Sequence, residues 1–185
     1  MSKSCGIIKL KFSSLIHLVI QPERVFPRKE TKRIMDFLIE NETFVVTDEV
    51  YEYLLLYNGF KHVSPAALDP KYKPWCIVVN SLSKTYAMTG WQIGYAAGPK
   101  EIIKGMNSLQ GHLTGNVNSI AQKAAVEALS GPQDDIARMV EEYTKRKGYM
   151  VNRINSIEGL SCIEPKGAFY VFAKVKDLFG RTYEG

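Results

Sequence analysis

The sequence predicts an α/β protein with a mostly parallel sheet, and three observations lead to that class. Strand-like segments of β-branched and apolar residues alternate with segments of helical periodicity. Acidic and lysine side chains directly follow two of the strand-like segments, as is typical of parallel sheets that bind ligands at their carboxyl ends. The chain has 185 residues, 45% apolar and 23% charged, which is ordinary for a globular protein.

The first predicted unit consists of a strand, a helix and a second strand. Residues 1–14 show no periodic pattern, whereas residues 15–20 form an apolar run that ends before Gln-Pro and predicts a buried strand. Residues 27–41 place apolar side chains at helical spacing and predict an amphipathic helix. The β-branched residues 43–47 predict the next strand. Two strands joined by one helix are expected to lie parallel.

A surface loop is predicted next, because Asn58-Gly59 is a turn signal and three prolines follow it. The chain is expected to return to the core in a strand at residues 76–80 and in another at 93–97. Pro99 opens a helix that extends to about Gly111, and a second helix is predicted from Ser119 to Ser130.

The last part of the chain predicts one long helix and two short strands. Gly131-Pro132 interrupts the preceding helix, and residues 133–157 then show apolar side chains at helical spacing. Residues 160–163 and 168–173 predict strands.

Two of the predicted strands end in residues that can do chemistry. Asp48 and Tyr51 follow the strand at 43–47, and the run SLSKTY follows the strand at 76–80. In that run Lys84 has hydroxyls one and three residues before it, on Ser83 and Ser81. A lysine in this position can form an imine with an aldehyde cofactor whose phosphate the hydroxyls hold.

Three stretches of the sequence resemble class I and II aminotransferases of pyridoxal phosphate fold type I, in particular aspartate and aromatic aminotransferases. They are residues 48–51 (DEVY), 81–95 (SLSKTYAMTGWQIGY) and 166–170 (KGAFY). The resemblance extends from about Val25 to Asp177 and is most specific in its middle. It implies an enzyme that transfers an amino group between an amino acid and a 2-oxo acid, with aspartate and 2-oxoglutarate as the favoured pair.

The resemblance also implies a domain organisation. Residues 1–132 correspond to the C-terminal half of a large domain built as a three-layer α/β/α sandwich. Residues 133–185 correspond to an interdomain helix and the start of a small α+β domain. The chain is therefore expected to be truncated at both ends, with the family's glycine-rich phosphate loop before residue 1 and its carboxylate-binding arginine after Gly185. A homodimer is the assembly that the resemblance implies.

The resemblance assigns roles to individual residues. Lys84 is expected to carry the Schiff base with pyridoxal 5′-phosphate and then to move the proton at the substrate α-carbon. The carboxylate of Asp48 is expected to hold the pyridine nitrogen protonated, and the Tyr51 phenol to contact the ring's 3-oxygen. Ser81 and Ser83 correspond to hydroxyls that bind the phosphate.

Gln92 departs from the family pattern. Eight residues after the lysine, where the family has an arginine that pairs with the cofactor phosphate, this chain has an amide. An amide cannot form the bidentate charged pair, so we expect about ten- to hundredfold weaker cofactor binding. Residues 20–24 likewise differ from the Asn-Pro-Thr-Gly turn that the family has there.

Two other functions remain open from the sequence. A lyase or decarboxylase on the same scaffold would use the same Asp48, Tyr51 and Lys84, since these residues serve any reaction through a carbanion. An aminotransferase-like binding module without turnover is favoured by Gln92 and disfavoured by the intact Asp48 and Lys84.

Charge, apolar runs and metal-binding residue types exclude several other classes. The net charge is +5, but the basic residues alternate with acids in helical segments, so nucleic-acid binding is not expected. The apolar run at 15–20 is far shorter than the roughly 20 residues of a membrane span, and a cytoplasmic location is expected. The cysteines and histidines are scattered without metal-ligand spacing, which predicts reduced thiols and no metal. They are Cys5, Cys76, Cys162, His17, His62 and His112.

Overall fold

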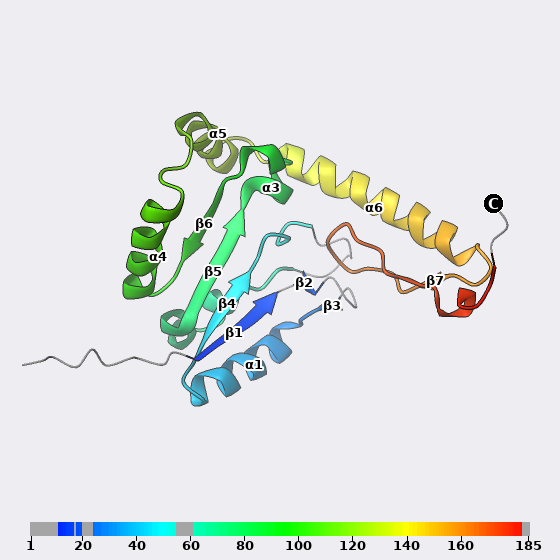
Figure 1. Cartoon of the computed structure of the whole chain (residues 1–185), viewed down its shortest axis with the longest axis horizontal. Helices are drawn as coiled ribbons and strands as arrows, with labels where there is room; N and C mark the ends of the chain where they lie inside the picture. The colour runs from blue at the N-terminus through cyan, green and yellow to red at the C-terminus, as the bar shows by residue number, and fades with distance from the viewer. Residues whose placement is uncertain (1–10, 17, 20–23, 55–60, 183–185) are drawn as a thin grey trace, which may run out of the picture.

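A four-stranded mixed sheet forms the centre of the molecule (Figure 1). The computed structural model describes residues 11–16, 18–19, 24–54 and 61–182. The strand order is β1-β4-β5-β6, where β1 (Lys11–Ile16), β4 (Thr43–Asp48) and β5 (Cys76–Ser81) are parallel. β6 (Gly94–Ala97) pairs with β5 in the antiparallel direction. The predicted α/β class and mostly parallel sheet are confirmed.

The first strand lies earlier in the chain than predicted. Residues 15–20 were expected to form it, and residues 1–14 showed no periodic pattern, but β1 occupies Lys11–Ile16 and pairs in register with β4. A lysine and two serines in this strand hide it from a search for apolar runs. β2 (Leu18–Val19) instead pairs antiparallel with β3 (Arg24–Val25). His17, the stretch 20–23 and the Asn58-Gly59 turn lie outside the described residues.

α1 (Arg28–Glu40) covers one face of the sheet, as the amphipathic pattern predicted. It begins after Pro27, whose carbonyl accepts hydrogen bonds from the amides of Glu30 and Thr31, and the Asn41 side chain caps its end by donating to the Phe37 carbonyl. The buried side of α1 packs on β4 in a core cluster. The fully buried members of that cluster are Met35, Val45, Tyr72 and Cys76.

The segment between β4 and β5 contains short helices where a surface loop was expected. They are α2 (Pro65–Leu68) and the 3₁₀-helix η1 (Pro70–Trp75). Each begins with a proline, whose fixed φ favours the first helical position. After β5 come α3 (Leu82–Thr85), the 3₁₀-helix η2 (Thr89–Trp91), α4 (Lys100–Leu113) and α5 (Ser119–Ser130). The predicted helices at 99–111 and 119–130 are confirmed.

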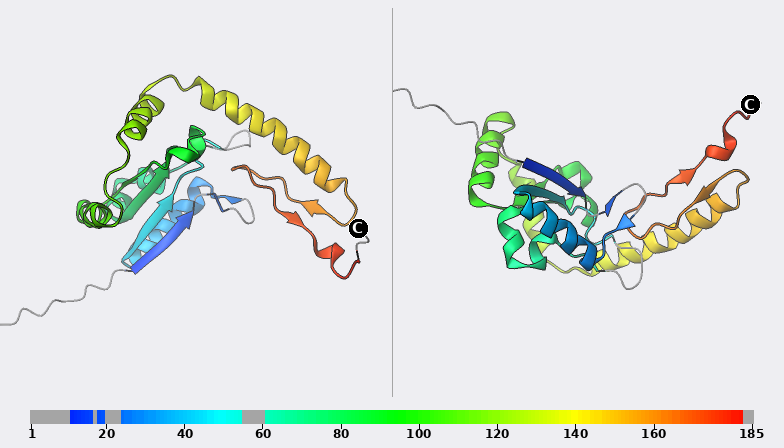
Figure 2. Two further views of the ribbon diagram at one scale, coloured as in Figure 1. Left: turned by 45° about the horizontal axis from the view of Figure 1, so that its top comes forward. Right: turned by 90° about the horizontal axis from the view of Figure 1, so that it is seen from below.

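α6 (Asp134–Asn155) is the long helix that the sequence predicted, and the chain turns back beside it (Figure 2). β7 (Ser161–Cys162) and β8 (Ala173–Lys174) pair antiparallel, and the 3₁₀-helix η3 (Lys176–Leu178) follows. The predicted strand at 168–173 is wrong, because only its last residue belongs to β8. Ala168 has a positive φ of 56°, which interrupts an extended conformation there.

A second core cluster lies at the carboxyl edge of the sheet. Its buried members are Val25, Tyr51, Leu54 and Ala168. The amide of Ala168 donates to the Leu54 carbonyl at 2.8 Å, and α6 adds partly buried apolar side chains to the cluster. This core therefore joins the end of β4 to the segment that follows β7.

Two remaining expectations can be compared with the described part of the chain. No helix found there is long and apolar enough to cross a membrane. Cys76 and Cys162 are both free thiols, while Cys5 lies outside the described residues. Burial, with a contribution from the nearby charge of Glu49, raises the pKa of the Cys76 thiol to about 12. That thiol is therefore unreactive at neutral pH.

Candidate active site

Asp48 and the segment carrying Lys84 leave the sheet at the same edge. Asp48 is the last residue of β4, and Ser81 is the last residue of the parallel neighbour β5. The register places Asp48 opposite Val79, two residues before Ser81. Parallel neighbours are about 4.8 Å apart, so side chains from these two strand ends enter the same region.

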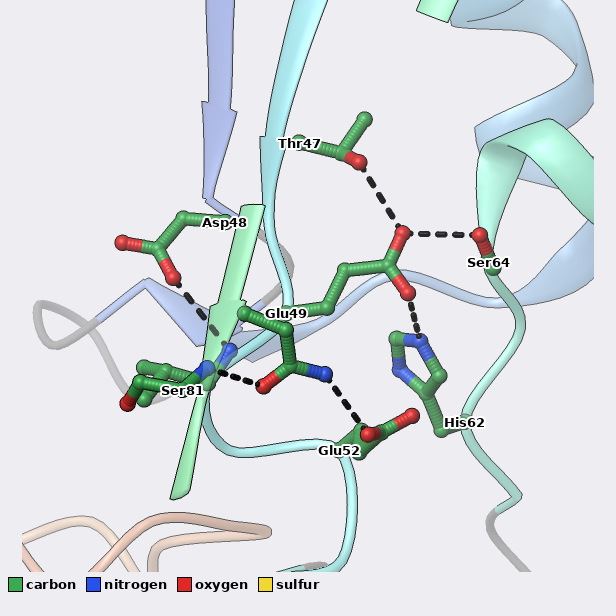
Figure 3. A network of polar contacts seen from close by, with 9 residues as sticks. Thr47, Asp48, Glu49, Glu52, His62, Ser64 and Ser81 are labelled. Atoms are coloured by element: carbon green, nitrogen blue, oxygen red, sulfur yellow. Dashed lines mark hydrogen bonds and ion pairs between the residues drawn. The ribbon is translucent and has the colours of Figure 1, made fainter. Parts of the chain in front are cut away.

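The Asp48 side chain lies on the face of β4 opposite to its buried neighbours. Thr47 and Glu49 are buried, whereas Asp48 is half-buried. Figure 3 shows its carboxylate directed away from the Glu49 carboxylate. One Asp48 oxygen accepts a hydrogen bond from the Val50 amide at 3.2 Å, which closes a turn after the strand and orients the carboxylate. The other carboxylate oxygen can accept a hydrogen bond from a ligand.

Tyr51 is buried in the second core cluster, with its hydroxyl 2.7 Å from that of Tyr170. Its ring contacts Phe169 edge-on, at 5.5 Å between centroids. Burial, together with the Tyr170 hydrogen bond and the nearby charge of Asp48, raises the pKa of the Tyr51 phenol above its ordinary value. The phenol therefore stays protonated at neutral pH and can donate a hydrogen bond.

Lys84 lies on α3, the short helix that follows β5. The Ser81 hydroxyl caps this short helix by accepting a hydrogen bond from the Ser83 amide at 3.3 Å. The Lys84 ammonium lies over the Phe169 ring, 5.3 Å from its centroid. Tyr51 and Lys84 thus contact the same aromatic ring, and the Asp48 charge acts on Tyr51.

Phe169 and Tyr170 are site residues to which the sequence assigned no role. They belong to the KGAFY run that carried part of the resemblance, so a signal was present. Their partners lie far away in the sequence, since Tyr51 and Tyr170 are 119 positions apart. The positive φ of the buried Ala168 turns the chain just before them. No periodic pattern in a sequence reveals a contact of that range.

The remaining predicted cofactor residues differ in their surroundings. Ser81 and Ser83 are half-buried, and the Asn80 side chain holds Ser81 by accepting from its amide at 2.8 Å. Gln92 is exposed, with a left-handed φ of 51°, and its side-chain amide donates to the Thr89 carbonyl at 2.7 Å. Gln92 therefore closes its own turn. The roles of these three residues in cofactor binding stay predictions, as do those of Asp48, Tyr51 and Lys84.

Glu49 forms a buried polar network on the other face of β4 (Figure 3). Its carboxylate accepts hydrogen bonds from Thr47 at 2.9 Å and Ser64 at 2.8 Å, and its second oxygen is 2.8 Å from Nε2 of His62. Burial raises the pKa of Glu49, but the contacts with His62, Ser64 and Thr47 outweigh it and hold that pKa below its ordinary value. The sequence had grouped His62 with the histidines that are scattered without metal-ligand spacing.

The same network accounts for the one potential metal-ligand group among the described residues. Glu49, Glu52 and His62 place ligand atoms within 4.8 Å of one another. Both oxygens of Glu49 already have hydrogen-bonding partners, and the Glu52 carboxylate accepts from the side-chain amide of Asn80 at 2.7 Å. These contacts explain the cluster as a hydrogen-bonded network.

We expect the stabilising effect of Glu49 to disappear in acid. Because the pKa of Glu49 is lower in the folded protein than in the unfolded chain, its contribution is present above the unfolded pKa and is lost as the pH falls through the folded pKa. Thermal unfolding of the wild type and Glu49→Gln from about pH 6 to about pH 3 would show the Tm difference shrinking. A difference that stays constant over this range would contradict the prediction.

A mostly parallel sheet with an acid, a phenol and a lysine at one edge is an α/β fold with a candidate ligand site at its strand ends. Comparison with known proteins identifies the family within this class. The chain belongs to the class I and II aminotransferases, whose family model matches residues 24–180.

The curated relatives of this chain include aspartate aminotransferases. The chain is 41% identical over 153 residues to an aspartate aminotransferase of Geobacillus stearothermophilus, covering 83% of this chain and 39% of the relative. It is 43% identical over 158 residues to a probable aspartate/prephenate aminotransferase of Rhizobium leguminosarum bv. phaseoli, covering 85% and 39%. The chain thus spans about two fifths of the length of these curated relatives.

Solved structures show the same fold. The aspartate aminotransferase of Rhizobium meliloti matches with a TM-score of 0.85 and 37% identity, over 92% of this chain and 42% of that one. An aromatic aminotransferase of Pyrococcus horikoshii OT3 matches with a TM-score of 0.82 and 34% identity, over 88% and 43%.

Proposed function

We propose that this chain carries the lysine-bearing part of a pyridoxal phosphate aminotransferase that acts on an amino acid and a 2-oxo acid. The observations that carry the proposal are that Asp48 and the segment with Lys84 follow neighbouring parallel strands, and that Tyr51 and Lys84 both contact the Phe169 ring. Aspartate is the favoured amino acid, because the relatives named above include an aspartate aminotransferase. A 2-oxo acid such as 2-oxoglutarate would accept the amino group.

The side chains at this edge fit pyridoxal 5′-phosphate. A half-buried carboxylate, a protonated phenol and a primary amine match the pyridine nitrogen, the ring oxygen and the aldehyde of the cofactor. The hydroxyls of Ser81 and Ser83 offer donors for its phosphate. When bound, the cofactor supplies an aldehyde that bonds to amines and a ring that takes up the electron pair released at the substrate α-carbon.

The residues of the chain then have separate tasks. Asp48 keeps a proton on the ring nitrogen, because a carboxylate beside that nitrogen favours its charged form. Tyr51 donates its phenolic proton in a hydrogen bond to the ring oxygen. Lys84 would hold the aldehyde through its amine, and its Nζ would also accept the proton of the substrate α-carbon and return it.

We further propose the domain organisation that the sequence suggested. Residues 1–132 would form part of a three-layer large domain, and residues 133–185 an interdomain helix with the start of a small domain. The break between α5 and α6 at Gly131-Pro132 supports this boundary.

A homodimer is proposed as the assembly, supported by exposed apolar side chains on α4 and α5. Those side chains include Leu109, Leu113, Ile120 and Val126.

Trapping the cofactor on the protein tests the proposal. Pyridoxal 5′-phosphate is added to the 185-residue chain, the covalent bond is reduced with borohydride, and peptide mass spectrometry identifies the modified lysine. Modification concentrated on Lys84 is the expected result. Transfer of the aspartate amino group to 2-oxoglutarate is then measured in the same preparation. A uniform low modification of many lysines would refute the cofactor site.

A binding module without turnover is the second candidate. The exposed position of Gln92, with its amide bonded to its own turn, favours this function because a cationic partner for the phosphate is absent at that position. Specific modification of Lys84 without amino-group transfer is the result that would identify it.

We expect Gln92→Arg to strengthen cofactor binding about tenfold, because a guanidinium can form two charged hydrogen bonds with a phosphate. The dissociation constant of pyridoxal 5′-phosphate is measured by absorbance titration. Gln92→Lys is the matched control, since it adds the same charge without the planar fork and should give a smaller gain. Unchanged affinity in Gln92→Arg would show that position 92 does not reach the phosphate.

A further inference from the structure

We infer that Glu49 and His62 are positioning residues for Asp48, and that their contact sets how well the chain binds its cofactor. The inference rests on the proposed function, because it gives Asp48 a cofactor to bind. It goes further by assigning a task to a network on the opposite face of β4. Neither residue touches the predicted cofactor site directly, so both act through the backbone.

The network is more completely bonded than a surface ion pair. Glu49 is only 4% exposed, and the His62 side chain 14%. Donors from three places in the chain converge on the Glu49 carboxylate: Thr47 on β4, His62, and Ser64 just before α2. A buried carboxylate with several donors has one strongly preferred position, because any displacement leaves a charged oxygen without a partner.

That position is transmitted to Asp48 through the backbone on both sides of it. Thr47 and Glu49, the residues before and after Asp48, are joined by their own side chains at 2.9 Å. The Glu49 amide donates to the Val79 carbonyl on β5 at 2.9 Å, which holds the strand end to its neighbour. Asp48 is therefore held between two fixed residues, and its carboxylate has only the Asp48 side-chain torsions left to adjust.

The turn that follows carries the same constraint to Tyr51. The Glu49 carbonyl accepts from the Glu52 amide at 2.9 Å, and Asp48 accepts from the Val50 amide. Tyr51 lies inside this turn. Loosening Glu49 would consequently disturb both the acid and the phenol at the sheet edge.

His62 supplies the contact that can be removed and restored. His62→Phe keeps an aromatic ring of similar size but removes the donor to Glu49, whereas His62→Gln can place an amide nitrogen near the position of Nε2 and donate again. Tyr72→Phe is the matched control, because it removes a hydroxyl bonded to Asp36 at 2.7 Å in the cluster beneath α1. All variants are first compared by thermal unfolding.

The first measurement needs no cofactor. Hydrogen exchange of the Val50 amide reports the bond to Asp48, since that amide exchanges when the turn opens. We expect exchange about tenfold faster in His62→Phe, and near the wild-type rate in His62→Gln and Tyr72→Phe. A Val50 rate in His62→Phe that equals that of the wild type would overturn the inference. Should His62→Phe fail to fold, Ser64→Ala gives the same comparison with one hydroxyl removed.

The second measurement separates the inference from the proposed function. We expect the dissociation constant of pyridoxal 5′-phosphate to rise about tenfold in His62→Phe and to recover in His62→Gln. If Val50 exchange changes as expected but the wild type does not bind the cofactor, the proposed function fails and the positioning of Asp48 stands. If the wild type binds and His62→Phe binds equally well, the link to cofactor affinity is wrong.

Discussion

Lys84→Ala is expected to abolish specific attachment of pyridoxal 5′-phosphate to the chain. Alanine has no amine to bond with the aldehyde, and any amino-group transfer shown by the wild type should fall by about 10³-fold or more, because the variant also lacks the group that moves the α-proton. Borohydride trapping followed by mass spectrometry measures the first effect, and an amino-transfer assay with aspartate and 2-oxoglutarate measures the second.

Two further variants show whether the effect belongs to the amine. Lys84→Arg keeps a cation that can lie over the Phe169 ring, but a guanidinium stays protonated and cannot attack an aldehyde. It should therefore lose the adduct as completely as Lys84→Ala. Lys100 lies exposed at the start of α4, and Lys100→Ala should leave the trapping of the cofactor on the chain unchanged. Equal trapping in Lys84→Ala and the wild type would place the covalent site elsewhere.

Asp48→Asn is expected to weaken cofactor binding about ten- to hundredfold. The asparagine oxygen can still accept from the Val50 amide, so the turn after β4 is kept, but the charge that holds the ring nitrogen protonated is gone. A charged hydrogen bond lost in this way accounts for a change of that size. Absorbance titration with pyridoxal 5′-phosphate measures the dissociation constant.

The control for Asp48→Asn is an acid of the same type away from the sheet edge. Asp134, in the first turn of α6, is exposed, and Asp134→Asn should bind the cofactor as the wild type does. If Asp48→Asn also keeps wild-type affinity, its carboxylate does not meet the ring nitrogen, and the proposed orientation of the cofactor is wrong.

Elements with strong local signals were predictable from the sequence. β4 and β5 are short apolar runs followed by polar residues, and α1 and α6 repeat apolar side chains at helical spacing. The positions of Asp48 and Lys84 at neighbouring strand ends followed from those runs. Their chemical roles came from the resemblance and stay predictions.

Features that depend on tertiary contacts were not predictable. β1 contains polar residues that conceal it, and its place in the sheet is evident only from its pairing with β4. Residues 168–172 have the composition of a strand, yet Ala168 adopts a positive φ and donates to Leu54 instead. The contact between Glu49 and His62 joins residues 13 positions apart, with no spacing that marks a pair.

The adjacency of Asp48 and Glu49 has a consequence for how faithfully the chain folds. Slipping the pairing of β4 with β5 by one residue would turn every side chain of β4 to the opposite face and exchange the two acids. The slipped edge would still display a carboxylate, so charge alone does not distinguish the two alignments. His62 and Ser64 do, because they lie outside β4 and an alignment that moved the Glu49 carboxylate away would leave these half-buried groups without their acceptor. The polar network therefore disfavours the slipped pairing of β4 with β5 during folding.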